Sequence, residues 1–205
     1  MGSARGGGIL TIGEFLLARL YNWHRIDSAL FRSAQMYRGH SRILLAAHGI
    51  ATVVNLRGAN PGTGWYQAER DACADLGIEH VDCPLHSRRL PRRQRLLDLL
   101  TVYETAPRPM LLKCSGGADR SAFAAALYLL HRDGPGARAA SLRQMRVLPY
   151  LHIPGGQQRW IRRFPEFLCE DATDGDIAAW VRERYEPDRF ADWLGARNLG
   201  TAWRR

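Results

Sequence analysis

Residues 110–130 read MLLKCSGGADRSAFAAALYLL, and they place Cys114 between two apolar runs. The run before Cys114 is typical of a short buried strand, and the Ala/Leu-rich run after Arg120 is typical of a buried helix. Between them lie two glycines and three other small residues, as a tight loop requires. A strand, a loop and a helix in this order indicate one unit of a parallel sheet.

The same alternation continues on both sides of this stretch. Strands are predicted at 29–34, 50–58, 78–84 and 108–114, and helices at 39–49, 65–77 and 120–134. Residues 87–105 are predicted to be a basic loop that runs into a helix, with Pro91 in the first turn of that helix. Further helices are predicted at 137–148, 155–168 and 174–195, of which the second contains Pro165 and should kink or break there. We therefore expect an α/β fold whose mainly parallel central sheet is flanked by helices, with extra helices at the C-terminus.

The length of 205 residues suits one domain with small extensions. Residues 1–21 are predicted to form a flexible tail and an N-terminal helix, 22–170 the main domain, and 171–205 a helical extension packed on it. The apolar run of the N-terminal helix is interrupted by Glu14 and Arg19 and falls far short of about 20 residues, so we do not expect stable membrane insertion.

The composition narrows the range of partners. Hydrophobic residues make up 46% and charged residues 24% of the chain, as in soluble globular proteins. The net charge of +9 favours anionic partners, and Lys113 is the only lysine. The sequence has no repeated pattern of basic and aromatic residues, so we do not expect nucleic acid as a partner. The four cysteines are widely spaced without a CxxC pair, so we predict no metal, no cofactor and a reducing, cytoplasmic setting. Nothing in the sequence indicates the oligomeric state.

The loop after Cys114 has the composition of an anion-binding site. In parallel sheets ligands bind beyond the carboxyl ends of the strands, which is where Cys114 falls. Glycines let successive amide N–H groups point inward, and the N-terminus of the next helix adds positive potential. Such a field should hold the cysteine as a thiolate. Arg120 offers a fork that matches two phosphoryl oxygens, and Ser121 can hydrogen-bond the sulfur. Together they predict phosphoryl transfer through a phosphocysteine.

This pattern, C-x5-R-S/T, resembles that of the cysteine-based protein tyrosine and dual-specificity phosphatases. The segments LFRSAQMYRGH, GIATVVNLRG, WYQAERDACADLGIEHVDCPL, KCSGGADRSAFAAALYLL and SLRQM occur in the order seen in the bacterial dual-specificity-like branch, over roughly residues 22–150. The resemblance implies a cysteine-phosphatase-like fold in 22–170, with phosphorylated proteins or small anionic phosphates as substrates. It makes Cys114 the nucleophile, Arg120 the phosphate clamp and Ser121 an aid to phosphoenzyme breakdown. The amide cradle would be Ser115, Gly116, Gly117, Ala118 and Asp119.

The general acid departs from the family pattern. Where many relatives have an aspartate, three residues beyond a proline, this chain has Ser87, which cannot protonate a leaving oxygen near neutral pH. Asp119 is the first replacement, since some bacterial relatives look similar there, and a salt bridge or helix cap is its alternative role. His86 is the second candidate and Asp82 the third.

Other positions leave two interpretations open. Lys113 and Arg57 are counted among the candidate substrate-binding residues. Lys113 replaces the family's usual histidine, and it either tunes the site or ends the strand. Arg57 either contacts substrate or forms a structural ion pair. Arg32 and Ser33 are expected to brace the phosphate loop from behind. Cys83, on a strand expected to neighbour that of Cys114, is either an oxidation partner of Cys114 or a buried core residue.

A basic cluster leaves the substrate open. The cluster either attracts polyanionic substrates or is a solvated surface, and it comprises Arg88, Arg89, Arg92, Arg93 and Arg95. If the cluster attracts polyanionic substrates, the alternative function is that of an inositol-phosphate or phosphoinositide phosphatase. A third possibility, a phosphate-binding module with little turnover, follows from Ser87.

Overall fold

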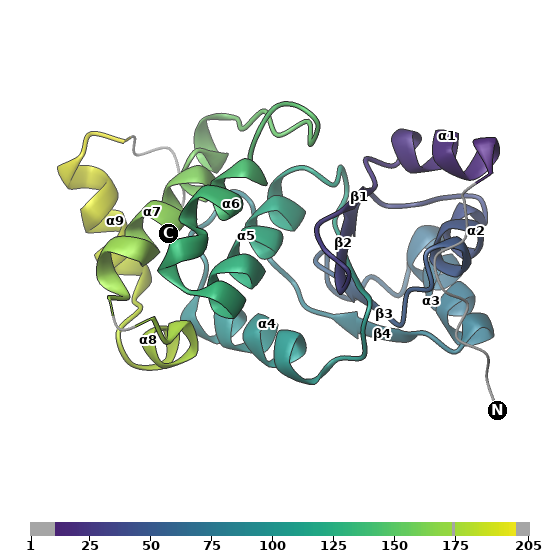
Figure 1. The fold of residues 1–205 in the computed structure, drawn as a ribbon, viewed down its shortest axis with the longest axis horizontal. Coiled ribbons are helices and arrows are strands. Elements are labelled where there is room, and N and C mark those ends of the chain that lie inside the picture. Colours follow the sequence, from purple (N-terminus) through teal and green to yellow (C-terminus); the bar gives the residue numbers. More distant parts are fainter. Residues whose placement is uncertain (1–10, 174, 200–205) are drawn as a thin grey trace.

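The computed structural model describes residues 11–173 and 175–199 (Figure 1). Within this part of the chain a five-stranded sheet has the strand order β1-β2-β5-β3-β4. The strands are β1 (His24–Arg25), β2 (Leu30–Ser33), β3 (Thr52–Asn55), β4 (Glu79–Asp82) and β5 (Met110–Lys113). Neighbouring strands pair in parallel except β1, which is antiparallel to β2. The predicted α/β fold with a mainly parallel sheet is confirmed, whereas the two-residue β1 was too short to leave a sequence pattern.

Helices cover both faces of the sheet (Figure 1). One group comprises α1 (Ile12–Leu20), α2 (His40–Ala47) and α3 (Gly64–Leu76). The other comprises α4 (Arg93–Thr105), α5 (Asp119–Asp133), α6 (Arg138–Arg143), α7 (Trp160–Asp171), α8 (Ile177–Glu183) and α9 (Pro187–Ala196). None of the helices in the described part of the chain has both the length and the apolar character that crossing a membrane requires.

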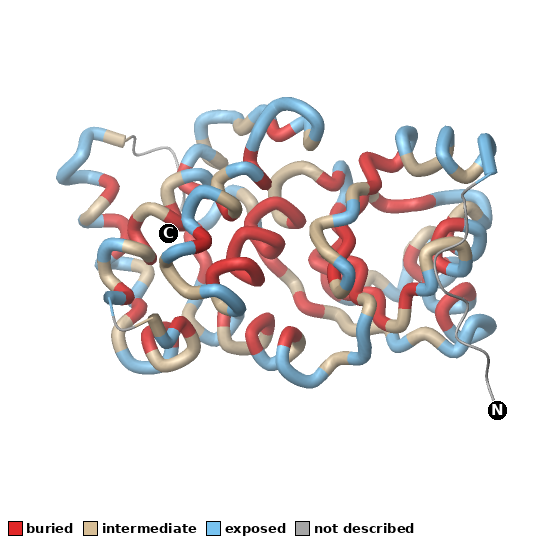
Figure 2. Tube along the Cα trace, viewed as in Figure 1, coloured by how far each residue is buried: buried red, intermediate tan, exposed pale blue. Residues whose placement is uncertain are grey.

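Alternation along the strands divides the core into two clusters. Leu111 of β5 packs in the cluster with α2, and Leu112 packs in the cluster with α4, α5 and α7. The parallel strands β2, β3 and β5 are buried at every position, including the polar Arg32, Asn55 and Lys113. Buried residues accordingly run through the middle of the molecule in Figure 2.

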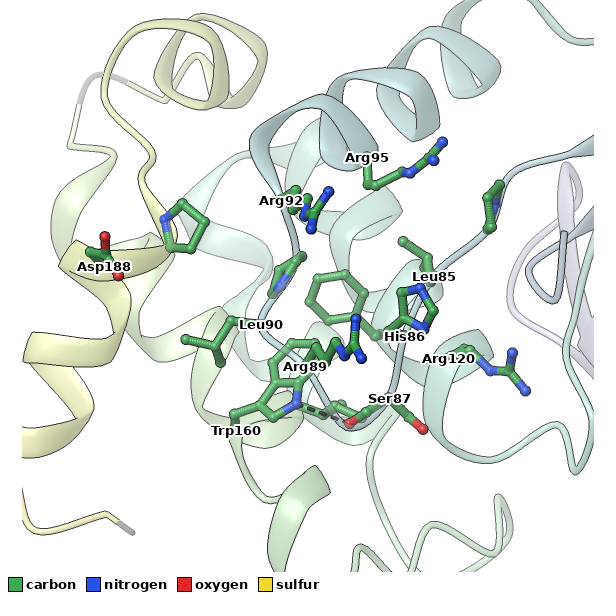
Figure 3. A pocket seen from close by; sticks show the side chains of 15 residues that line it. Leu85, His86, Ser87, Arg89, Leu90, Arg92, Arg95, Arg120, Trp160 and Asp188 are labelled. Carbon is green, nitrogen blue, oxygen red and sulfur yellow. Dashed lines mark hydrogen bonds between the residues drawn. The ribbon is translucent and has the colours of Figure 1, made fainter. Parts of the chain in front are cut away.

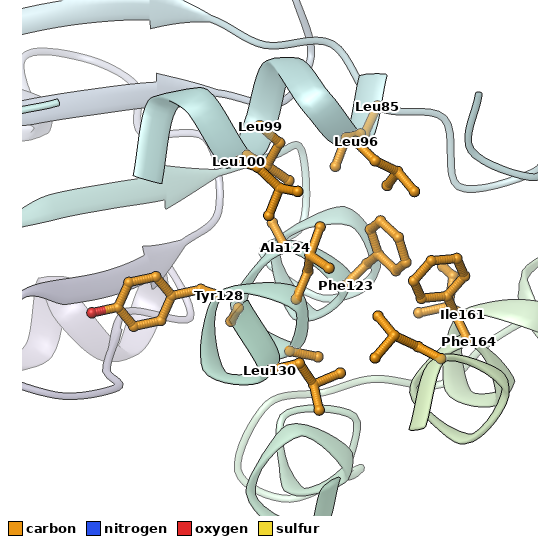
Figure 4. Packing of buried hydrophobic residues seen from close by; sticks show 14 of the residues in the cluster. Leu85, Leu96, Leu99, Leu100, Phe123, Ala124, Tyr128, Leu130, Ile161 and Phe164 are labelled. Carbon is orange, nitrogen blue, oxygen red and sulfur yellow. The ribbon is translucent and has the colours of Figure 1, made fainter. Parts of the chain in front are cut away.

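The C-terminal helices belong to the larger of these clusters. The rings of Phe123 on α5 and Phe164 on α7 lie 5.0 Å apart (centroid to centroid), and Phe164 also contacts Phe190 of α9 at 5.3 Å. Leucines of α4 close the same cluster from the other side (Figure 4). The helices after α6 therefore share the core of the sheet domain.

Three helix predictions were wrong in extent. The helix predicted at 137–148 ends earlier, at Arg143. The helix predicted at 174–195 is two helices, and Pro187 occupies the first turn of the second. α4 begins at Arg93, so Pro91 precedes it. α7 runs through Pro165 and does not end there. The flexible tail predicted before the N-terminal helix falls within residues 1–10, which lie outside the described residues.

The strand register positions the site. Lys113, at the end of β5, is level with Ser33 at the end of β2 and Asn55 at the end of β3. Because the three strands are parallel, the segments that follow them meet at the same sheet edge. Cys114 comes next on the central strand of the three.

Candidate active site

The loop between β5 and α5 has one position that only glycine can occupy. Gly117 has a φ of +64°, and a Cβ there would lie 2.5 Å from the backbone nitrogen of Ala34 and 2.6 Å from the carbonyl carbon of Ser33. The loop thus presses against the end of β2. This close approach sets its path around Cys114, which is only 3% exposed.

The carbonyl groups of this loop accept hydrogen bonds from two side chains that lie behind the loop. Nη2 of Arg32 donates to the carbonyl oxygens of Gly117 (2.8 Å) and Ala118 (3.0 Å). Nδ2 of Asn22 donates to those of Gly116 (3.2 Å) and Gly117 (3.1 Å). Arg32 is fully buried, which lowers its pKa to about 10, so it stays charged at neutral pH. The bracing role expected for Arg32 is confirmed.

The amide groups of the same loop are left free. Among the hydrogen bonds of the described chain, none is donated by the backbone N–H groups of Ser115, Gly116, Gly117 and Ala118. A run of N–H groups whose carbonyls are held on the opposite side forms an anion-binding concavity. The N-terminus of α5 begins at Asp119 and adds its own unpaired amides.

The residues predicted for phosphate chemistry come together here. Sγ of Cys114 lies 3.7 Å from Oγ of Ser121, within hydrogen-bond distance for sulfur. Arg120 donates from Nη2 to Oγ of Ser115 at 2.6 Å. A cavity of about 620 Å³ opens over them, and its lining includes Cys114, Ser115, Gly116, Ala118, Asp119 and Arg120.

Asp119 is the carboxylate that shares this cavity with Cys114. Its Oδ2 accepts a hydrogen bond from Nε2 of Gln158 at 3.0 Å, and its Oδ1 lies 3.2 Å from Nδ1 of His152. The side chain is 25% exposed, so a substrate oxygen has access to it. Asp119 thus lies within salt-bridge distance of a histidine and is also accessible to a substrate oxygen.

The other two acid candidates are placed less favourably. His86 lines the cavity, but burial and then the charge of Arg89 and Arg120 lower its pKa, so it is neutral and a poor proton donor near pH 7. Asp82 accepts hydrogen bonds from the hydroxyl of Tyr66 and from Nδ2 of Asn55, and it is absent from the cavity lining. Of the three candidates, Asp119 and His86 line the cavity and Asp82 does not.

Neither Lys113 nor Arg57 lines the cavity. Lys113 is fully buried, with Nζ 2.6 Å from Oε1 of Glu69 and 2.8 Å from Oε1 of Gln35. Arg57 lies over the ring of Trp65, 3.6 Å from its centroid. These placements argue against the substrate contacts expected for both residues and favour structural roles.

Glu69 and Lys113 form a buried pair in which each partner favours the charged form of the other. Burial opposes the charge of Glu69, but the hydrogen bonds and charges of His80 and Lys113 outweigh it and leave its pKa lowered. Burial also lowers the pKa of Lys113, against the attraction of Glu69. Gln35 donates to Glu69 from its side chain and to the carbonyl of Ser115 from its backbone, so this pair is linked to the catalytic loop.

The expected neighbourhood of Cys83 and Cys114 was wrong. β3 lies between β4, which Cys83 follows, and β5, which Cys114 follows. Burial raises the pKa of Cys83 to about 12, which leaves an unreactive thiol. Cys83 is therefore a core residue.

Sequence reasoning missed three groups that touch the site. Asn22 lies 94 residues before Gly116 in the chain, and no local pattern connects them. His152 and Gln158 contact Asp119 from the segment after α6, part of which was predicted as helix. Pro149, Pro154 and the glycine pair at 155–156 were the available signal for an irregular segment there.

Comparisons with known proteins identify the fold. No family model matches the sequence, and no curated protein matches it. Among solved structures, TpbA of P. aeruginosa is 20% identical, with a TM-score of 0.54 over 86% of this chain and 92% of that one. A putative phosphatase of Shewanella putrefaciens is 15% identical, with a TM-score of 0.56 over 75% and 97%. The core catalytic domain of the PP-IP phosphatase SIW14 from S. cerevisiae is 14% identical, with a TM-score of 0.53 over 89% and 96%. The chain has the fold of the cysteine-based, PTP-like phosphatases, as the resemblance implied.

Proposed function

We propose that this protein is a metal-free phosphomonoester hydrolase that works through a phosphocysteine intermediate. The observation that carries the proposal is the ring of free amide N–H groups, from Ser115 to Ala118, beside a cysteine at the floor of a cavity. Such a ring stabilises the negative charge of phosphoryl oxygens. The fold shared with TpbA and SIW14 supports the same conclusion.

In the first step the thiolate of Cys114 attacks phosphorus, and the bond to the leaving oxygen breaks. The amides and Arg120 hold the non-bridging oxygens, while Asp119 gives its proton to the leaving oxygen. In the second step Asp119, now a carboxylate, takes a proton from water as that water attacks phosphorus. The sulfur departs as a thiolate, which the hydroxyl of Ser121 stabilises, and inorganic phosphate is released.

Phosphotyrosine in a protein or a small phosphate is the substrate class we place first. A cysteine-to-serine variant of TpbA, 20% identical to this chain with a TM-score of 0.51, was solved with pTyr. An inositol phosphate is the second candidate, because Arg88, Arg89 and Arg92 pair with no acidic residue in the described chain. We also propose a cytoplasmic setting, where thiols stay reduced.

A substrate panel tests the proposal. It comprises an aryl phosphate, phosphopeptides, inositol phosphates and phosphoinositides, each with the wild type and with Cys114→Ser. We expect hydrolysis of the aryl phosphate by the wild type and none by the variant. Hydrolysis of no substrate would favour a phosphate-binding module, and hydrolysis that survives in Cys114→Ser would refute the mechanism.

A further inference from the structure

A second cavity, of about 420 Å³, adjoins the catalytic one (Figure 3). It lies between the segment 84–92, the start of α4 and the helices α5, α7 and α9. Both cavities are lined by Leu85, His86, Ser87, Arg89 and Arg120. A ligand with its phosphate over Cys114 can therefore extend past Arg120 into the second cavity.

The inner wall of the second cavity is apolar and fixed. It is lined by buried side chains, namely Leu90, Phe123, Trp160 and Ile161. Nε1 of Trp160 donates to the carbonyl of Ser87 at 2.9 Å, which ties α7 to the segment shared by the two cavities (Figure 3). Because this wall is preformed, filling it with an apolar group costs little reorganisation.

The rim of the second cavity is basic. Arg89 and Arg92 are exposed at it, and neither forms an ion pair with an acidic residue of the described chain. Arg95 is paired with Asp98 at 3.3 Å, and Asp188 lines the opposite side from α9. Burial, and then the charge of Arg89 and the other nearby arginines, lowers the pKa of His86, which lies among them. Positive charge in excess at a rim favours an anionic ligand.

We propose that the second cavity binds the residues next to the phosphorylated one in a peptide substrate, where a large apolar side chain is accompanied by an acidic one. This inference rests on the proposed hydrolase function. An inositol phosphate satisfies the arginines but brings no apolar group to the inner wall, and a neutral apolar group leaves the arginines uncompensated. The wall closed by Phe123 and Trp160 suits a side chain that ends inside the cavity.

The test uses phosphotyrosine peptides in which one leucine and one glutamate are moved through the positions flanking phosphotyrosine. kcat/KM is measured for each peptide and for 4-nitrophenyl phosphate, which reaches only the catalytic cavity. We expect the best peptide to exceed its serine-substituted counterpart about tenfold, the value of burying one large apolar side chain. A uniform rate across all peptides would overturn the proposal.

Charge reversal at the rim gives the second readout. Arg92 is the residue before the first turn of α4, where an acidic side chain also suits the helix, so Arg92→Glu should fold. We expect it to lower the ratio of kcat/KM for the best peptide to kcat/KM for 4-nitrophenyl phosphate about fivefold. The matched control, Arg143→Glu on the exposed face of α6, should leave this ratio unchanged.

Three outcomes of these assays speak against the inference. One is an equal loss on both substrates in Arg92→Glu. The second is a higher kcat/KM for inositol hexakisphosphate than for every peptide, and the third is a higher kcat/KM for phosphoinositide vesicles than for every peptide, each lost in Arg92→Glu. Failure of the proposed function looks different, since the wild type would then leave 4-nitrophenyl phosphate intact, or Cys114→Ser would still hydrolyse it.

Discussion

Gly117 is the residue where the catalytic loop comes closest to β2. In Gly117→Ala the new Cβ meets the backbone of Ser33 and Ala34 at a positive φ, so the loop has to move. We expect hydrolysis of an aryl phosphate to fall at least tenfold and stability to fall by about 1–3 kcal/mol. Steady-state kinetics and urea unfolding measure the two effects. Gly62→Ala, in the loop before α3 and outside the site, is the control, because a Cβ there meets open space; equal effects in both variants would contradict this account.

We propose that turnover of substrates with poor leaving groups depends on Asp119. An alkoxide needs a proton as it departs, whereas a phenolate leaves with much less help. We therefore expect Asp119→Asn to lose about 10²-fold or more in kcat for an alkyl phosphate, and clearly less for an aryl phosphate. The rates of both substrates are compared in each variant.

Asp133→Asn, at the other end of α5, is the matched control and should change neither rate. Unchanged turnover of the alkyl phosphate in Asp119→Asn would rule out this assignment. A proportionate loss on both substrates would instead indicate a role in binding.

Some residues of the site could be predicted from a short stretch of sequence, and others could not. Cys114, Arg120 and Ser121 lie in one contiguous motif, so their meeting could be predicted from the sequence. Asn22 and His152 reach the loop only through the tertiary fold. Lys113 was predicted beside the substrate because of its position next to Cys114, but alternate strand residues point to opposite faces.

At the scale of elements, the Glu69–Lys113 pair joins α3 to the strand that carries Cys114. Glu69→Gln leaves the ammonium of Lys113 buried without its counter-charge, which costs about 3–5 kcal/mol. We expect that loss in urea unfolding at pH 7. Asp75→Asn, which breaks the exposed Arg42 pair, should cost less than about 1 kcal/mol.

The same pair predicts a pH dependence. Because the pKa of Glu69 is lowered in the folded protein, its stabilisation is complete above its ordinary value of 4.5 and is lost as pH falls through the lower folded value. The stability difference between wild type and Glu69→Gln should therefore shrink below pH 4.5. A difference that grows on acidification would show that Glu69 is protonated in the native state.

The elements were predicted best where apolar runs are bounded by glycine. Gly49 and Gly77 follow α2 and α3 with positive φ, as the sequence indicated. The end of α6 was missed, because Val147 and Leu148 continue its apolar spacing although both side chains are exposed. Burial is a property of the assembled molecule, and spacing alone does not report it.

At the scale of the whole molecule, the C-terminal helices share the core that supports the catalytic loop. Phe164 is 1% exposed and contacts aromatic rings of α5, α7 and α9. We expect Phe164→Ala to lower the free energy of unfolding by about 3–5 kcal/mol, in one cooperative transition.

Leu148→Ala is the control for that measurement, since this side chain is 74% exposed and should contribute within about 0.5 kcal/mol. Calorimetry and fluorescence are compared in each variant. Two separate transitions would show that the helices after α6 form an independent unit.

Detection of the phosphocysteine tests the central claim most directly. The protein is mixed with an aryl phosphate, quenched within milliseconds and analysed by mass spectrometry of the peptide that contains Cys114. We predict one added phosphoryl group on Cys114 in the wild type, none in Cys114→Ser, and a larger trapped fraction in Ser121→Ala, where breakdown is slowed. Turnover of the aryl phosphate without phosphate on Cys114 at any quench time would contradict the account.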